Sequence, residues 1–317
     1  MAGLAPTQET APLRALVSVP NGAWAVAVAP SLRRAYVTSR ESDAVTFVDL
    51  DQNRVEQTVT IGPDPHNLVV DEAAGRLYVT LHGGTSALRG DAVAVLDATT
   101  GAVLAKWPTG PFPAQIDLDP NLGRLFVVNE GDSTITVLDT QSGAEVQRIG
   151  VAGSGTDVAV SPPTGHVYVT TWPARLLVTL DGRTGETLAQ TPLGQMPLRI
   201  AVNPVTERVY VGDGTTPGAD RGELWTVDGR TQVATSRRLG WLPLGIGVDP
   251  EGDTVLATDA RLGLLSVLDG TGQEIRWQGA VGAGPHTIVP SRALGRAYVV
   301  ISATNTLGVL DWPLPAR

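Results

Sequence analysis

Residues 124–139 read RLFVVNEGDSTITVLD, two short apolar runs that flank a polar turn and end at Asp139. Each run has the length and the bounding turn residues of a β-strand, so the stretch predicts a β-hairpin. The closing aspartate recurs along the chain, 41 to 48 residues apart, as in TFVD at 46–49 and VAVLD at 93–97. The seven aspartates are Asp49, Asp97, Asp139, Asp181, Asp228, Asp269 and Asp311. A period just above 40 residues built from short strands is typical of a propeller blade, so the sequence predicts seven blades.

A second marker precedes each aspartate and begins a run such as YVT. The marker residues are Tyr36, Tyr78, Phe126, Tyr168, Tyr210, Leu256 and Tyr298. The marker lies 13 residues before the aspartate in five repeats, but 19 and 18 residues before it in the second and fifth. The extra length therefore belongs to one kind of connection.

Each repeat is predicted to form four strands, A to D. In the third repeat we expect strand A at 114–118, strand B at 124–128, strand C at 134–138 and strand D at 145–151. No stretch shows helical periodicity over three turns. The predicted fold is all-β, a seven-bladed β-propeller with four-stranded antiparallel blades.

The ends of the chain indicate how the ring closes. The first strand A begins near Trp24, and residues 13–19 before it have the pattern of a strand D. The last repeat ends near Asp311 and is followed by Pro313 and Pro315, which cannot donate ladder hydrogen bonds. We therefore expect residues 13–19 to complete the last blade and protect its edge. Residues 1–12 are then an N-terminal tail, and 13–317 form one propeller domain.

The recurring runs resemble a known family. YVTS at 36–39, YVTL at 78–81 and YVTT at 168–171 are similar to the YVTN-family propeller repeat. Together with GPDPHNLVVD at 62–71 and GWLPLGIGVDP at 240–250, they resemble the YncE-like proteins of that family. The resemblance implies a seven-bladed ring from about residue 13 onward. It leaves function open, because the family includes exported proteins, surface-layer proteins and nucleic-acid binders, and similar rings carry lactonases and lyases.

Composition narrows the classes of partner. A formal net charge of −9 makes nucleic acid an unexpected partner, because contacts to phosphates depend on Lys and Arg. The chain has no cysteine, which excludes disulfides and thiolate chemistry. No apolar run is long enough to span a membrane, and residues 1–12 lack the features of a secretion signal. We expect a monomer, periplasmic or extracellular if a signal peptide has been removed and cytoplasmic otherwise.

Comparison among the repeats separates structural residues from candidates for function. The seven aspartates recur, and we expect them to accept backbone N–H bonds in the turns that follow. The residues that begin strand A differ from blade to blade. Because strand A is innermost, these residues should ring the mouth of the central channel. They include Trp24, His66, Asn67, Gln115, Asp157, Arg199 and His286.

In an antiparallel meander the D-to-A and B-to-C connections lie on one face, so we expect a polar ligand-binding funnel there. The predicted ligand-binding residues are Trp24, His66, Asn67, Gln115, Asp157, Arg199, His286, Glu130, Trp172, His82 and Asp213. Other residues expected around the funnel are Arg40, Glu41, Arg89, Asp91, Asn129, Asp220, Arg221, Asp259 and Arg261. We further expect an ion pair between Asp157 and Arg199, and Trp24 as a plug of the mouth.

Binding of a small molecule, peptide or protein partner at this funnel is the function that the sequence favours. A metal-assisted lactonase or lyase is the alternative, with His66 and His286 as candidate catalytic residues, because imidazole serves both metal binding and acid–base chemistry. His66, His286 and Asp157 are then the candidate ligands of a divalent metal ion. The two histidines should lie on the order of 10 Å apart, since blade one separates them. Single-stranded nucleic-acid binding, with bases stacked on Trp172 and Trp241, is a second alternative.

Overall fold

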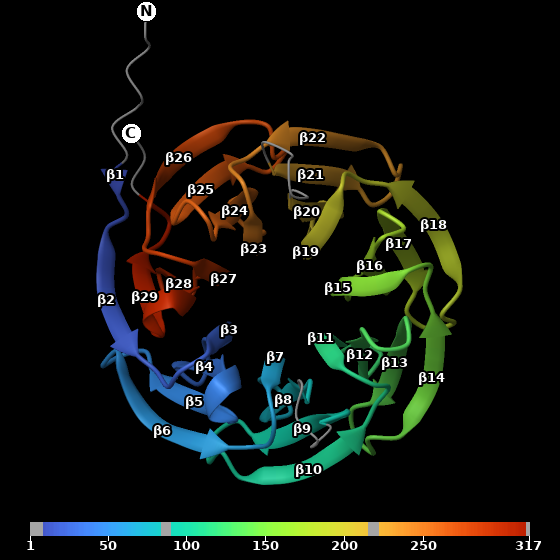
Figure 1. Cartoon of the computed structure of the whole chain (residues 1–317), viewed down its shortest axis with the longest axis horizontal. Helices are drawn as coiled ribbons and strands as arrows, with labels where there is room; N and C mark the ends of the chain where they lie inside the picture. Colours follow the sequence, from blue (N-terminus) through green and yellow to red (C-terminus); the bar gives the residue numbers. More distant parts are fainter. Residues whose placement is uncertain (1–8, 84–89, 215–221, 315–317) are drawn as a thin grey trace, which may run out of the picture.

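The computed structural model describes residues 9–83, 90–214 and 222–314. Seven sheets stand around a common axis, each built on four antiparallel strands, with one strand near the axis and one at the periphery (Figure 1). The expected all-β, seven-bladed propeller is confirmed. Blade 1 comprises β3 to β6, blades 2 to 6 take the next strands in groups of four, and blade 7 combines β27 to β29 with β2.

Within every blade the chain runs outward from strand A to strand D. The A strands are β3 (Ala23–Ala29), β7 (Pro65–Asp71), β11 (Pro113–Asp119), β15 (Ser154–Ser161), β19 (Met196–Asn203), β23 (Pro243–Asp249) and β27 (Pro285–Ser291). The B strands are β4 (Arg34–Ser39), β8 (Arg76–Leu81), β12 (Arg124–Asn129), β16 (His166–Trp172), β20 (Arg208–Gly214), β24 (Thr254–Asp259) and β28 (Arg296–Ile301). The C strands are β5 (Ala44–Asp49), β9 (Ala92–Asp97), β13 (Thr134–Asp139), β17 (Leu176–Asp181), β21 (Glu223–Asp228), β25 (Leu264–Asp269) and β29 (Thr306–Asp311). The D strands are β6 (Arg54–Thr60), β10 (Val103–Pro108), β14 (Glu145–Gly150), β18 (Thr187–Pro192), β22 (Ala234–Arg238), β26 (Ile275–Ala280) and β2 (Leu13–Ser18).

Among the described residues, helical structure is confined to two single turns of 3₁₀ helix, η1 (Arg40–Ser42) and η2 (Ser302–Thr304), both in B-to-C connections. Over the described ranges, no helix has the length or apolar character needed to cross a membrane. All four strands predicted for the third repeat are present within two residues of the expected ends.

The ring closes through its N-terminal strand, as predicted. β2 pairs antiparallel with β29, with Leu16 opposite Gly308 and Val17 opposite Leu307. Val17 and Val19 are buried in a cluster that continues into blade 1 through Val26 and Val37. Arg14 adds an exposed ion pair with Asp311, 3.1 Å between Nη1 and Oδ1. The closing strand thus joins the first and last blades through both hydrogen bonds and core packing.

A further N-terminal strand was not predicted. β1 (Glu9–Thr10) pairs parallel with β26, with Glu9 opposite Gly279, and becomes a fifth strand at the outer edge of blade 6. Ala11 is buried and donates its N–H to Ala280 O at 2.7 Å. The segment that precedes β2 therefore bridges blades 6 and 7.

Six of the recurring aspartates hold the C-to-D turns that follow them. Asp97 Oδ1 accepts the N–H groups of Thr99 and Thr100 at 2.9 and 2.7 Å, and Asp49, Asp139, Asp181, Asp228 and Asp269 make equivalent bonds. These bonds lower the pKa of Asp97 because they favour the ionised carboxylate. Asp311 has no turn of this kind to stabilise, and its carboxylate pairs with Arg14 instead. The role predicted for the aspartates, acceptance of backbone N–H groups in the following turn, is confirmed for six of them and is wrong for Asp311.

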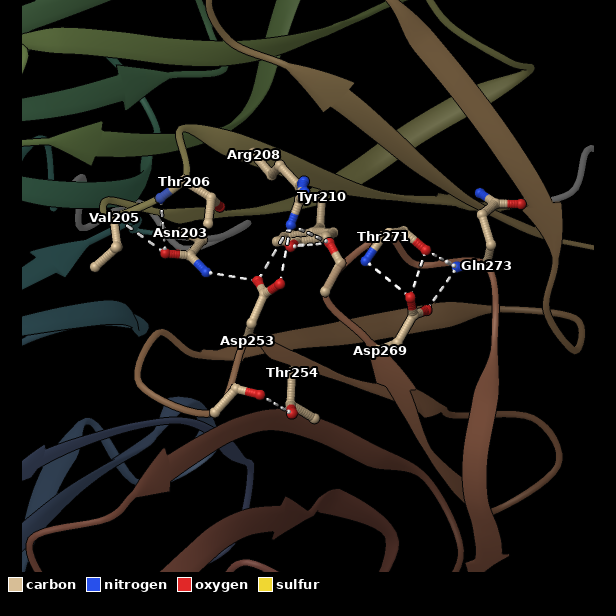
Figure 2. Close-up of polar contacts among 12 residues, drawn as sticks. Asn203, Val205, Thr206, Arg208, Tyr210, Asp253, Thr254, Asp269, Thr271 and Gln273 are labelled. Atoms are coloured by element: carbon tan, nitrogen blue, oxygen red, sulfur yellow. Dashed lines mark hydrogen bonds and ion pairs between the residues drawn. The ribbon is translucent and has the colours of Figure 1, made fainter.

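Neighbouring blades are joined by the marker tyrosines and by the arginine two residues before most of them. In blade 5 the Tyr210 hydroxyl donates to Gly270 O at 2.6 Å, and Arg208 Nη1 donates to Asp253 Oδ2 at 3.0 Å (Figure 2). Both acceptors belong to blade 6. The same view shows the turn held by Asp269 beside this contact. Buried tyrosines thus fill the space between blades and also supply a directional bond.

We expect Tyr210→Phe to destabilise the fold by about 1 kcal/mol, because it removes a buried hydrogen bond and little volume. Tyr298 provides the matched control. It is equally buried, but its hydroxyl has no hydrogen-bond partner among the described residues. Tyr298→Phe should therefore leave the urea midpoint unchanged or raise it. Equal losses in the two variants would show that the tyrosines act through packing alone.

Candidate functional site

The D-to-A and B-to-C connections meet on one face, as expected, and form a groove of about 480 Å³ there. Its lining residues come from blades 7, 1 and 2, and all lie in or next to these connections. This mouth groove is lined by Gly22, Ala23, Trp24, Arg40, Glu41, Asp64, Ser302 and Asn305. The wall of the groove is tightly packed at Gly22. This residue has φ +81°, and a Cβ there would lie 2.5 Å from Glu41 N. Asn305 Oδ1 holds the same turn by accepting the N–H of Gly22 at 2.9 Å.

The floor of the mouth groove is a stack of charged and aromatic groups. Arg40 donates from Nε and Nη2 to the two oxygens of Asp64, at 2.5 and 2.9 Å. Its guanidinium carbon also lies 4.6 Å from the ring centroid of Trp24, a cation–π distance. The bidentate pair fixes Arg40 over the indole ring. Arg40 therefore holds Trp24 in place from the solvent side.

His82 extends this network toward blade 3. Its Nδ1 lies 3.3 Å from Asp64 Oδ2, and its Nε2 lies 3.5 Å from Glu130 Oε2. Burial lowers the pKa of His82, but the two carboxylates outweigh it and raise the pKa to about 9. The pKa of Asp64 is shifted in the opposite direction. Burial favours the neutral form of its carboxyl group, yet Arg40 and His82 hold its pKa well below the usual range. At neutral pH the network is a chain of alternating charges, with Glu130 as its partly exposed end.

Trp24 stands between the two histidines that the sequence singled out. The ring centroids of Trp24 and His286 are 3.9 Å apart, and those of Trp24 and His66 are 5.4 Å apart. The histidine side chains were expected to ring the channel mouth, and they are buried there: His66 is 6 % and His286 3 % exposed, because the indole and its neighbours cover them. His66 Nδ1 has Ala114 O as a partner at 3.1 Å, whereas neither ring nitrogen of His286 has one among the described residues.

Burial also sets the charge of these histidines. It lowers the pKa of His286 to about 3, with the positive charge of Arg199 acting in the same direction. The pKa of His66 is likewise well below its ordinary value because of burial and then of Arg40 and Arg199. Both imidazoles are therefore neutral at physiological pH.

A cavity of about 120 Å³ lies on the axis below Trp24, lined by all seven A strands. This channel cavity is lined by Trp24, Ala25, Asn67, Gln115, Asp157, Val158, Arg199, Ile200, Leu244, Gly245, Ile246 and Thr287. The structure thus brings together four of the predicted polar residues, Asn67, Gln115, Asp157 and Arg199. Trp24 borders both the mouth groove and the channel cavity, in agreement with its expected position as a plug.

The expected ion pair between Asp157 and Arg199 is wrong. Asp157 accepts the N–H of Val158 at 2.9 Å and that of Ile200 at 3.1 Å, so both oxygens are occupied by backbone. Arg199 Nη1 turns back to Leu198 O at 3.3 Å. Burial raises the pKa of Asp157 to about 6, although Arg199 and the backbone bonds act against the rise. The carboxylate of Asp157 therefore links blades 4 and 5 through hydrogen bonds to the backbone of both.

Three other predicted residues lie away from this centre. Asp213 is buried and accepts the N–H of Met196 at 2.8 Å, which holds a D-to-A turn, and burial raises its pKa to about 6. Trp172 is exposed at the end of β16. Trp241 stacks under Arg261 at 4.4 Å, in blade 6. The Arg–Trp stacks thus occupy blades 1 and 6 and do not adjoin. Arg89, Asp220 and Arg221 lie outside the described residues.

Sequence reasoning missed two carboxyl groups. Asp64 was not predicted, although its place two residues before His66 in a D-to-A connection puts it on the expected face. Asp117 breaks the apolar pattern of β11, and its oxygens accept the N–H groups of Leu118 and Val160 at 2.8 and 2.7 Å. Burial raises the pKa of Asp117 to about 7. The interruption of an apolar strand by a charged residue was the available signal.

The proposed metal ligands are not assembled into a site. Over residues 9–83, 90–214 and 222–314, no group of three or more His, Asp or Glu side chains could hold a metal ion. The ring of Trp24 separates His66 from His286, and both carboxylate oxygens of Asp157 already accept hydrogen bonds from backbone N–H groups. Nothing in this part of the chain favours metal-assisted catalysis.

Comparison with known proteins supports the fold and leaves the family open. No family model matches the chain, and no curated protein matches its sequence. Among solved structures, it is similar to a chain of the hydrazine synthase of Kuenenia stuttgartiensis, with a TM-score of 0.79 and 15 % identity over 99 % of each chain. At this identity the likeness shows a common seven-bladed fold alone. Membership of the YVTN family stays a hypothesis.

Proposed function

We propose that this protein is a binding protein whose ligand, a small molecule or a segment of a peptide or protein partner, occupies the mouth groove. The observation that carries the proposal is the groove itself: one preformed hollow, lined from three blades, with aromatic and charged groups at the mouth of the channel. Membership of the YVTN family, which the repeats suggest, is compatible with this role.

The rigidity of the groove supports binding. Arg40 is fixed by Asp64, the turn at Gly22 is fixed by Asn305, and Ser302 Oγ donates to Gly284 O at 2.8 Å. A ligand would meet side chains that are already ordered, so it would lose less binding free energy to the ordering of the site.

The charges indicate what the ligand presents. Asp64 neutralises Arg40, whereas Glu41 is exposed and makes no ion pair with any described residue. The free charge at the groove is therefore negative. We infer that the ligand places an ammonium, a guanidinium or another hydrogen-bond donor beside Glu41.

A ligand screen with matched variants tests this function. Amines, guanidinium compounds and short basic peptides should be screened by native mass spectrometry, and each hit measured by calorimetry. We expect Glu41→Gln to weaken a genuine hit by about tenfold, because it removes a charge-assisted bond. Glu186→Gln, an exposed substitution next to a C-to-D turn on the opposite face, should change nothing. Hits equally sensitive to both changes, or to neither, would place binding elsewhere.

A further inference from the structure

The channel cavity is bordered by a cation, Arg199, that has no carboxylate partner in the part of the chain that the structure describes. Arg199 reaches this cavity from β19, yet it makes no ion pair with any described carboxylate, and its single hydrogen bond goes to Leu198 O. A guanidinium carries five N–H donors. Most of the donors of Arg199 therefore have no acceptor among the described residues.

A second donor follows from the hydrogen bonds of Asn67. Asn67 Oδ1 accepts the N–H of Leu68 at 2.7 Å, which assigns the amide orientation and leaves Asn67 Nδ2 as a donor. Nδ2 donates to Gln115 Oε1, so the NH₂ group of Gln115 is the free end of its amide. Gln115 also lines the cavity. On the side of the cavity formed by Asn67 and Gln115, the polar group available to a ligand is therefore a hydrogen-bond donor.

The remaining walls are largely apolar. Leu244 and Ile246 come from β23, and Val158 comes from β15. Asp157 is the acidic residue of the lining, and its oxygens already accept backbone N–H groups. A ligand here therefore combines an acceptor group with a short hydrocarbon part.

We propose that the channel cavity binds a small monocarboxylate with a short alkyl chain. The carboxylate receives hydrogen bonds from the guanidinium fork of Arg199 and from the Gln115 amide, and the alkyl group packs against Leu244 and Ile246. The carboxylate of Asp157 on the same wall disfavours ligands with two negative charges. This inference goes beyond the function proposed for the mouth groove, since Trp24 separates the two hollows and is the one residue that their linings share.

Titration of the intact protein with sodium propionate, followed by calorimetry and by NMR of ¹³C-labelled propionate, tests the proposal. We expect saturable binding at one site, and binding of the neutral isostere propionamide weaker by about tenfold or more. Arg199→Gln should weaken propionate by a similar factor. Gln115→Glu, which keeps the acceptor for Asn67 and replaces the donor by an acid, should do the same. Arg183→Gln, an exposed arginine on the opposite face, is the control and should have no effect.

Several outcomes would overturn the proposal. These are no binding at about 50 mM propionate, binding that survives Arg199→Gln, or nitrate and phosphate binding as tightly as propionate. If Arg199→Gln does not fold, as judged by circular dichroism, the wild-type comparison of propionate with propionamide decides the question. Because Glu41 is absent from this cavity, loss of binding in Glu41→Gln bears on the mouth groove and not on this inference.

Discussion

Removal of residues 1–19 is expected to produce a protein that aggregates or melts at least about 7 °C below the full chain. The deletion removes β2, exposes the edge of β29 and takes Val17 and Val19 out of a buried cluster. Two buried valines and the lost ladder contribute on the order of 5 kcal/mol. In a domain of this size each kcal/mol shifts the melting temperature by roughly 1.5 °C, because the entropy of unfolding grows with the number of residues. Differential scanning calorimetry together with light scattering measures both effects.

Shorter truncations are the controls. Removal of residues 1–8 leaves every described contact in place, so the melting temperature should stay within about 2 °C of the full chain. Removal of residues 1–10 also deletes β1, a two-residue strand, and should cost only slightly more. A 1–19 truncation that melts like the full chain would show that β2 does not close the ring.

Between pH 7.5 and 9.5 the protein is expected to lose about 2 kcal/mol of its unfolding free energy through His82 alone. The folded pKa of His82 is raised to about 9 by Asp64 and Glu130 against the effect of burial, and its ordinary value is 6.5. Because the pKa of His82 is higher in the folded protein than in the unfolded chain, protonation of His82 stabilises the fold. This stabilisation is complete below the ordinary pKa and is lost as the pH rises through the folded pKa. Urea unfolding at several pH values measures the slope.

The chosen window isolates this histidine. The pKa of Asp117 is raised by burial only to about 7, so its effect is largely complete below the window. Burial lowers the pKa of His66 and His286, so their effects lie below pH 6.5. His82→Gln should remove the slope, whereas His166→Gln, which lies on the other face and makes no ion pair with a described residue, should keep it. A His82→Gln protein with the wild-type slope would refute the assignment.

The repeat made the secondary structure predictable from sequence. Short runs such as those at 124–128 and 134–138 alternate between two sheet faces, and turn residues bound them, so each strand is specified by a few neighbours. Closure was predictable by counting, because seven blades need 28 strands and the C-terminal end lacks one. The strand at Glu9–Thr10 was not predictable, since two residues carry no periodicity and their pairing depends on the free edge of β26.

The site was predictable in position and not in its contacts. Strand A is innermost in every blade, so the residues that begin it converge on the axis, as Asn67, Gln115, Asp157 and Arg199 do. Which atoms then meet depends on side-chain rotamers and on distances of a few ångströms between blades. Asp157 bonds to backbone instead of Arg199, because the N–H of Ile200 lies within reach across the blade boundary.

The sequence by itself determined the number of blades, the order of strands and the face on which the variable residues gather, because these follow from local patterns repeated seven times. The tertiary structure decided the rest. It placed Trp24 between His66 and His286 and joined Arg40, Asp64 and His82 into one charged network. These contacts link residues of different blades, and the electrostatic and packing forces between them depend on separations that no repeat pattern encodes.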